Sequence, residues 1–230
     1  MPLGAYLIGL AAIVLVPSMA SAQDPGPLGP YVVDLHVAMA GLPKDPSFFP
    51  SVPSGTFVPT RALGLDVGGH VYPLRIGPAR LGIGASLART AGRASPAQPS
   101  TSSTSSPPPR QTSPDVDSTM TTLAPQLSLN FGSSTGWSYI SAGVGQTRIT
   151  STASSYASGS SSSASTVEEK VLELQRRQTI NVGGGARWFL TTHVAFSFDV
   201  RIHMIAARAT EEARTAKATT IVAGAGLSFR

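Results

Sequence analysis

The stretch VAFSFDVRIHM, residues 194–204, carries the pattern that decides the fold. Every second residue is apolar, whereas Asp199, Arg201 and His203 all fall on the opposite face. Successive side chains of a β-strand point to opposite faces, so this period of two predicts a strand with one apolar and one polar face. The apolar face consists of Val194, Phe196, Phe198, Val200, Ile202 and Met204.

The same alternation recurs along most of the chain, in segments of about ten residues, which is the length that a tilted membrane strand needs. With 194–204, these segments make a set of eight: 31–39, 63–71, 81–87, 123–131, 140–144, 180–190 and 221–229. We therefore expect an all-β chain, folded as an eight-stranded antiparallel up-and-down barrel.

The connections between these segments alternate in length. The short ones are 73–78, 132–136 and 191–193, and the long ones are 41–60, 91–121, 150–177 and 207–218. Short turns on one side and long loops on the other are typical of a transmembrane β-barrel.

The two faces of the segments indicate which one meets lipid. The polar face is rich in glycine, serine and alanine, which suit the narrow interior of an eight-stranded barrel. The other face has large residues and no charge near the segment centres, as lipid requires, and closure leaves no unpaired strand edge. Aromatic residues near segment ends are expected to form interfacial girdles: Tyr31, Tyr72, Phe131, Trp137, Trp188 and Phe229.

The first 22 residues are expected to be a secretory signal peptide. An apolar run at 6–16 is too short to span a bilayer and is followed by Ala20-Ser21-Ala22, a small-residue cleavage pattern. No Lys or Arg precedes the run, and an uncleaved helix is the alternative interpretation. Cleavage after Ala22 leaves residues 23–230 as the barrel domain.

Two long connections have a biased composition. Residues 94–119 are rich in Ser, Thr and Pro, and residues 150–166 are almost entirely Ser, Thr and Ala. Such segments bury too little apolar surface to offset the entropy of ordering, so we expect disordered, exposed loops. Residues 167–177 have helical spacing, but they can equally extend the sixth strand above the membrane.

Three stretches carry a resemblance to a known family. The sequence GGGARWFL at 183–190, the turn 191–193 and the strand 194–201 are similar to the penultimate hairpin of the outer-membrane β-barrel domain family (OmpA- and OmpX-like). Residues 137–145 resemble the family's fifth strand, and 219–229 resemble its last strand. The resemblance implies an outer-membrane location and recognition of the last strand by the barrel-assembly machinery. It implies little about activity, because the family is functionally heterogeneous.

The candidate site is a network of ionisable groups on the inward face. Buried charge must be paired or hydrated, so a salt-bridged plug is the favoured interpretation and a proton or ion path is the second. Three histidines lie on different strands, but their heights are not fixed by sequence, and no metal site is predicted. The predicted network comprises Asp34, His36, Asp66, His70, Arg187, Asp199, Arg201 and His203.

Several kinds of function are excluded. The chain has no cysteine, so it has no disulfide or thiolate metal site. The net charge is +5, but the basic residues are scattered, which argues against nucleic acid. The glycine clusters 82–84 and 183–185 complete no phosphate-binding motif, so no cofactor is expected. No Ser–His–acid trio is evident near the outer rim, so no catalytic residue is assigned.

The sequence therefore predicts a small, non-enzymatic outer-membrane barrel that serves envelope structure or external contact through its long loops. The expected partners are outer-membrane lipid and the assembly machinery, and the external partner is unknown. A narrow gated channel for ions or small solutes is the alternative. A soluble secreted β-barrel that binds an apolar ligand is the further alternative, and it requires the apolar face to point inward.

Overall fold

The computed structural model describes residues 29–49, 52, 56–95, 114–133, 135–156, 167–173, 176–209 and 214–230. These residues are almost entirely β structure, with one 3-10 helix, η1 (Pro46–Phe48). No helix in the described part of the chain has the length and apolar character needed to cross a membrane. The strands are β1 (Tyr31–Gly41), β2 (Arg61–Ile76), β3 (Ala79–Ala94), β4 (Asp115–Ser133), β5 (Gly136–Tyr156), β6 (Val167–Glu173), β7 (Arg177–Phe189), β8 (Val194–Ile205), β9 (Arg208–Ala209), β10 (Arg214–Thr215) and β11 (Ala218–Phe229).

Eight of these strands close into a barrel, as the sequence predicts. Each pairs antiparallel with its neighbours in the order β4-β3-β2-β1-β11-β8-β7-β5, and β5 pairs back with β4. The ring therefore has no unpaired edge within the membrane, the condition that lipid imposes on a β structure. The up-and-down order follows from the short turns, which force consecutive strands to be neighbours.

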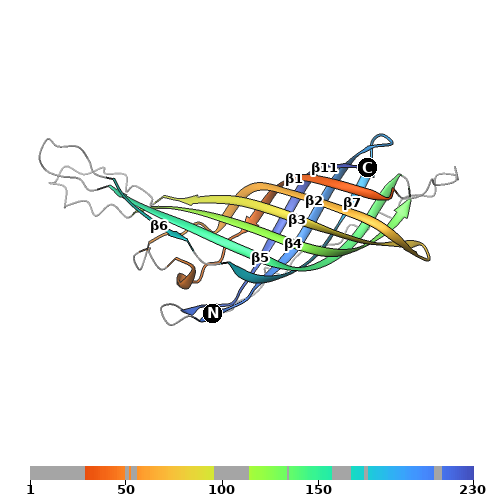
Figure 1. Ribbon diagram of the computed structural model, residues 1–230. Helices are drawn as coiled ribbons and strands as arrows, with labels where there is room; N and C mark the ends of the chain where they lie inside the picture. Colours follow the sequence, from red (N-terminus) through yellow and green to blue (C-terminus); the bar gives the residue numbers. More distant parts are fainter. Residues whose placement is uncertain are drawn as a thin grey trace, which may run out of the picture.

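The strands extend much farther beyond the ring at one end of the barrel than at the other (Figure 1). Tight turns join β2 to β3, β4 to β5 and β7 to β8 at one end. At the other end β3, β4 and β5 extend past the ring, and β6 pairs with the far end of β5, from Thr150↔Glu173 to Tyr156↔Val167. We call this long part of the sheet the extension. The extension shows that 167–173 continue the sheet, so the helical interpretation of this stretch is wrong.

The strands are longer than the sequence analysis expects. Residues 115–119 of β4 and 150–154 of β5, which the composition predicts to be disordered loops, pair with each other in regular register, and residues 155 and 156 continue β5 against β6. A strand of serine and threonine can form here because the neighbouring strands on its two sides supply hydrogen-bond partners for its backbone N–H and C=O groups. The predicted signal peptide at 1–22 and the remaining predicted loop residues 96–113 and 157–166 lie outside the described residues.

The apolar face points outward. In β1, for example, Val37 is 65% exposed, whereas Ala38 beside it is fully buried. The outward-facing Phe196, Phe198 and Val200 of β8 are likewise exposed. Exposed apolar side chains surround the ring and form a belt. Such a belt is solvated well by lipid and poorly by water. The soluble-barrel alternative is therefore wrong, because it needs these residues in the interior.

The girdle prediction is wrong for two of its six residues. Tyr72 and Trp137 are 4% and 1% exposed, and they pack inside the barrel with Val32 and the half-buried Phe189. The Trp137 ring meets Tyr72 and Phe189 edge-on, at centroid distances of 6.2 and 5.0 Å. These four residues form an aromatic cluster at the short-turn end. Tyr31, Trp188 and Phe229 do face outward.

A second cluster fills the opposite end of the interior. The 3-10 helix η1 lies in the connection between β1 and β2 and inserts Phe48, which is fully buried, among inward side chains of the barrel. We call this set the aliphatic cluster. It consists of Phe48 and Phe49 with Ala38, Ala40, Leu42, Ala62, Val116, Met120, Ile149, Ile205 and Val222.

Candidate functional site

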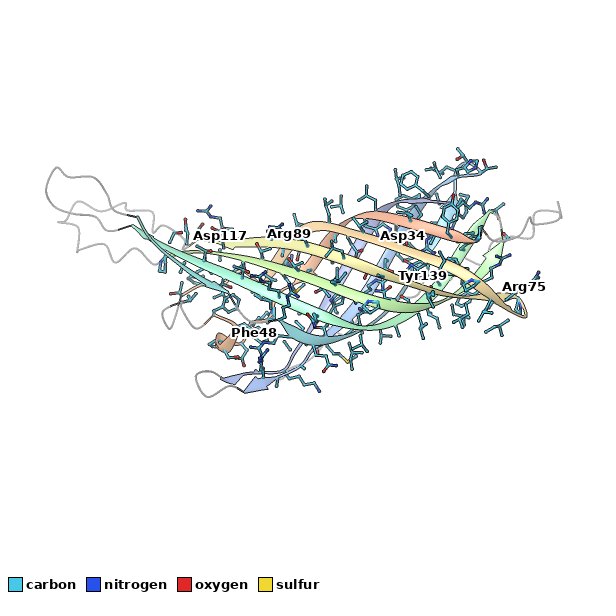
Figure 2. The ribbon with its side chains drawn as sticks, viewed as in Figure 1. Asp34, Phe48, Arg75, Arg89, Asp117 and Tyr139 are labelled. Atoms are coloured by element: carbon cyan, nitrogen blue, oxygen red, sulfur yellow. The ribbon has the colours of Figure 1, made fainter. Side chains whose placement is uncertain are left out.

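The structure places every residue of the predicted network inside the barrel, between the aromatic and aliphatic clusters. All eight are less than 9% exposed. They come from four strands, two each from β1 and β2, one from β7 and three from β8. Asp34 lies between the two ends of the barrel, whereas Arg75 is at the short-turn tip and Asp117 is on the extension (Figure 2).

Arg187 and Asp34 form the first buried ion pair. Arg187 Nε and Nη2 donate to the two carboxylate oxygens of Asp34 at 2.8 and 2.7 Å, a bidentate arrangement. The Ser228 hydroxyl also donates to Asp34. Bidentate guanidinium–carboxylate pairs are among the strongest polar contacts in proteins, and this one joins β1, β7 and β11 across the interior.

Arg201 and Asp199 form the second pair, although they lie two residues apart on β8. Arg201 Nε is 2.6 Å from one carboxylate oxygen of Asp199, and Arg201 Nη2 donates to the other at 3.0 Å. Arg201 Nη1 donates to the Ser141 hydroxyl of β5 at 3.0 Å. The charge of each partner is therefore compensated within the barrel.

Tyr139 of β5 links the two pairs. Its hydroxyl donates to Asp199 at 2.6 Å, and the Arg187 guanidinium lies over its ring, 3.9 Å from the centroid. Tyr139 lies on the buried face of β5, next to the outward-facing Ile140, and the predicted network does not include it. The signal was available, because a large residue with a hydroxyl among small inward residues must find a polar partner.

Glycines make room for this arrangement. A Cβ on Gly185 would lie 2.1 Å from the Phe198 carbonyl oxygen and 2.8 Å from the Tyr139 hydroxyl. A Cβ on Gly183 would lie 2.6 Å from Arg201 Cγ. The cluster at 183–185 thus serves close packing of the interior, which explains its presence without a phosphate-binding role.

The three histidines of the network have different neighbours. His36 Nε2 is hydrogen-bonded to the Ser197 hydroxyl at 2.7 Å, and His70 stacks on Tyr72 with ring centroids 6.2 Å apart. His203 lies opposite Asn181 in the β7–β8 register. Among the described residues, no group of three or more His, Asp or Glu side chains is arranged to hold a metal ion.

The His36–Ser197 pair is one that sequence reasoning missed, and it resembles part of a nucleophilic site. Both residues are buried, at 3% and 0% exposure, between the two apolar clusters. Within the described part of the chain, no hydrogen bond joins His36 to a carboxylate. The pair is therefore closed off from a substrate and lacks the third member that orients the base.

Hydroxyl and amide groups fill the interior toward the aliphatic cluster. The Thr179 hydroxyl donates to Thr147 at 2.8 Å, and Thr147 is also hydrogen-bonded to Thr122 at 2.8 Å. Gln126 Nε2 donates to the Ser86 hydroxyl at 2.7 Å. These contacts join β3, β4, β5 and β7, so hydrogen bonds cross-link one side of the polar interior.

A closed ring, an exposed apolar belt and a buried polar interior together define an integral β-barrel of the outer membrane. Of the folds that can span a bilayer, only such a barrel satisfies its backbone with strands. Neither a family model nor a curated protein matches the chain.

Solved structures with the same general architecture are found at low sequence identity. Neisserial surface protein A is 13% identical, with 86% of this chain and 95% of that chain covered and a TM-score of 0.46. OprG of Pseudomonas aeruginosa is 11% identical, with 86% and 94% covered and a TM-score of 0.46. Ail of Yersinia pestis, solved with the heparin analogue sucrose octasulfate, is 12% identical, with 86% and 96% covered and a TM-score of 0.40.

Proposed function

We propose that this protein is a closed, non-enzymatic barrel that stabilises the envelope and presents its extension outside the cell. The observation that carries the proposal is the filled interior. The paired charges of Arg187 with Asp34 and of Arg201 with Asp199 occupy the middle of the barrel, between an aromatic and an aliphatic cluster.

A filled interior of this kind opposes conduction. An ion that passes along the axis has to displace Trp137 at one end and Phe48 at the other, and both side chains are at most 1% exposed. Between them it has to separate ion pairs whose partners would then be left unpaired and buried away from bulk water, which costs several kcal/mol each. The narrow channel is therefore the less favoured function.

Planar-bilayer recordings test this directly. The purified, folded protein is expected to produce no steps of conductance above the bare bilayer at any voltage that the bilayer tolerates, because no continuous water path crosses the two clusters. A large general porin inserted in the same bilayer serves as the positive control. Reproducible steps that change in size with Asp199→Asn or Arg201→Gln would contradict the proposal and support the gated channel.

The extension is the part of the molecule suited to external contact. It carries β3, β4, β5 and β6 beyond the ring, and its exposed side chains include Arg93 and Asp117. Arg93 Nη2 lies 2.7 Å from Asp115 Oδ2 and Nε lies 3.8 Å from Asp117, so ion pairs tie β3 to β4 here. We propose that this end faces outward and that the short turns face the periplasm, as is usual for this class.

Cysteine labelling determines the orientation, because the chain has no cysteine of its own. On intact cells, a membrane-impermeant maleimide is expected to label Asp117→Cys on the extension and to leave Arg75→Cys at the short-turn tip unlabelled. Both variants should react after the cells are lysed, and the parent protein should never react. Labelling of Arg75→Cys alone on intact cells would reverse the orientation.

The remaining parts of the proposal follow from the class. Residues 1–22 would direct export and be removed, leaving 23–230 as the mature domain. The partners would be the lipids around the belt and the assembly machinery that meets β11, with no nucleic acid and an external partner that is unknown. Support for a non-enzymatic role comes from the burial of His36 and Ser197, which leaves their polar atoms out of reach of a substrate.

A further inference from the structure

The outer surface of the barrel is hollowed where β3, β4, β5 and β7 leave the belt. The groove has a volume of about 1110 Å³ and lies on the outside of the barrel, away from the filled interior. One end is apolar and belongs to the belt, and it is formed by Leu87, Leu123, Pro125 and Val144. The other end is polar and lies toward the extension, and it is formed by Arg89, Thr119, Thr121, Gln146, Arg148, Thr150, Arg176 and Gln178.

Neutral side chains at the polar end have hydrogen-bonding capacity that the protein does not use. They are the hydroxyls of Thr119, Thr121 and Thr150 and the amides of Gln146 and Gln178. Within the described part of the chain, none of these side chains is hydrogen-bonded to another protein group. A hydroxyl and a primary amide each donate and accept hydrogen bonds. The groove therefore offers unused donors and acceptors at the level where the belt ends and lipid headgroups begin.

The strand register gathers these groups into adjacent pairs. Gln146 of β5 lies opposite Gln178 of β7, and Thr119 of β4 lies opposite Thr150 of β5. Side chains directly opposite each other have Cβ atoms about 4.5–5.5 Å apart, so the two members of a pair can bind one small group together. From Gln146 to Thr150 the polar end runs for about 14 Å along β5, because an antiparallel strand rises about 3.4 Å per residue. The polar end therefore has room for a headgroup with several hydrogen-bonding groups in a row.

Hydrogen bonding distinguishes this groove better than charge does. Arg148 is already engaged in an interaction. Glu173 of β6 lies opposite Thr150 in the ladder, so an acidic residue accompanies the arginines at the polar end. An ionised phosphate accepts hydrogen bonds and an ammonium group donates them, whereas a sugar hydroxyl does both, as the neutral side chains of the groove do. The lining therefore favours an uncharged, hydroxyl-rich headgroup over an ionic one.

We propose that this groove binds a glycolipid, with an acyl chain against Leu123 and Val144 and an uncharged sugar headgroup hydrogen-bonded to Gln146, Gln178 and the neighbouring threonines. A glycolipid satisfies both ends of the groove at once. A free sugar leaves the apolar end uncovered, and a lipid without a sugar leaves the amides and hydroxyls without partners. The inference rests on membrane insertion of the barrel and goes beyond the proposed role in the envelope.

Native mass spectrometry of the purified, folded protein tests the site in amine-oxide micelles, which contain no sugar. The probes are diglucosyl diacylglycerol, together with diacylglycerol and phosphatidylglycerol that carry the same acyl chains. Diglucosyl diacylglycerol is expected to bind at least about tenfold more tightly than either of the other lipids. The reason is that each neutral hydrogen bond contributes about twofold to tenfold in affinity, and the headgroup can form several.

Substitutions in the lining locate the sugar. Gln146→Leu/Gln178→Leu preserves the size of both side chains and is expected to abolish the preference for diglucosyl diacylglycerol over diacylglycerol. Thr121→Val, which removes one hydroxyl within the groove, is expected to weaken glycolipid binding about threefold. Thr219→Val is the matched control, since it makes the same exchange at an exposed position of β11 outside the groove, and this variant should bind as the parent does.

Four results would overturn the inference. Equal binding of diglucosyl diacylglycerol and diacylglycerol would show that the sugar is not recognised. Tighter binding of phosphatidylglycerol would make the groove a site for anionic lipid. Undiminished binding by Gln146→Leu/Gln178→Leu would place the glycolipid elsewhere on the belt, and displacement by free maltose at equal concentration would show that the acyl chain contributes nothing. The difference in migration between unheated and heated protein on a gel reports folding of every variant separately, so loss of the lipid site is distinguishable from loss of the barrel.

Discussion

Replacing Arg187 with methionine is expected to lower the free energy of unfolding by about 3–5 kcal/mol, because it leaves Asp34 buried and without its cation. The substitution Arg187→Met keeps most of the side-chain volume, so it tests the charge and not the packing. Among the described residues, the Ser228 hydroxyl is then the one remaining hydrogen-bond donor to the Asp34 carboxylate. Urea unfolding of the protein in lipid vesicles measures the effect through the shift in the transition midpoint at constant slope.

The double variant Arg187→Met/Asp34→Asn separates the two possible causes of that loss. If the cost comes from an uncompensated charge, removing the carboxylate as well should recover more than half of it. Arg75→Met is the matched control, since this exposed arginine at the short-turn tip should change stability by about 0.5 kcal/mol or less. A single variant that loses less than about 1 kcal/mol, or a double variant no better than the single, would show that the pair does not organise the interior.

The second large effect is expected on the outside of the barrel. Val200 lies near the centre of the outward face of β8, so Val200→Arg places a charge close to the bilayer midplane at a cost of about 2–4 kcal/mol. In a water-soluble barrel the same change at a 41%-exposed valine would be close to neutral. Unfolding in vesicles, measured as above, decides between these two environments.

Val194→Arg provides the matched control, because the same residue types are exchanged at the end of the same strand. There the arginine can reach water, and the expected cost falls to about 0–1 kcal/mol. A depth-independent effect, equal at positions 194 and 200, would contradict the lipid-facing assignment of the belt.

The alternation of residue types was sufficient to predict which side chains point inward. The same alternation also places Tyr72 and Trp137, the two aromatics wrongly assigned to the girdles, on the inward face. Tyr72 continues the inward series of Asp66 and His70, and Trp137 continues the inward series of Tyr139 and Ser141. The girdle prediction relied on their position near strand ends. The alternation of side chains between the two faces of a strand is imposed by backbone geometry, whereas the preference of aromatics for interfaces is statistical. The alternation therefore determines where Tyr72 and Trp137 point.

Composition was a weaker guide to strand length. The serine- and threonine-rich composition predicts loops beyond the membrane, yet 115–119 and 150–154 form a regular ladder and 155–156 pair with β6. Low hydrophobicity indicates that a segment cannot build a core of its own. The outer parts of β4 and β5 need no core, because their backbones are hydrogen-bonded to each other and because they continue strands that the barrel already orders.

By itself, the sequence determined the strands, their two faces and therefore the barrel, because a period of two depends only on local backbone geometry and the contrast between lipid and interior. Only the tertiary structure decided which inward residues meet. Arg187 reaches Asp34 across 153 positions, and Tyr139 joins two ion pairs on separate strands. The stagger at which the ring closes sets these contacts, and that stagger is a property of all eight strands together.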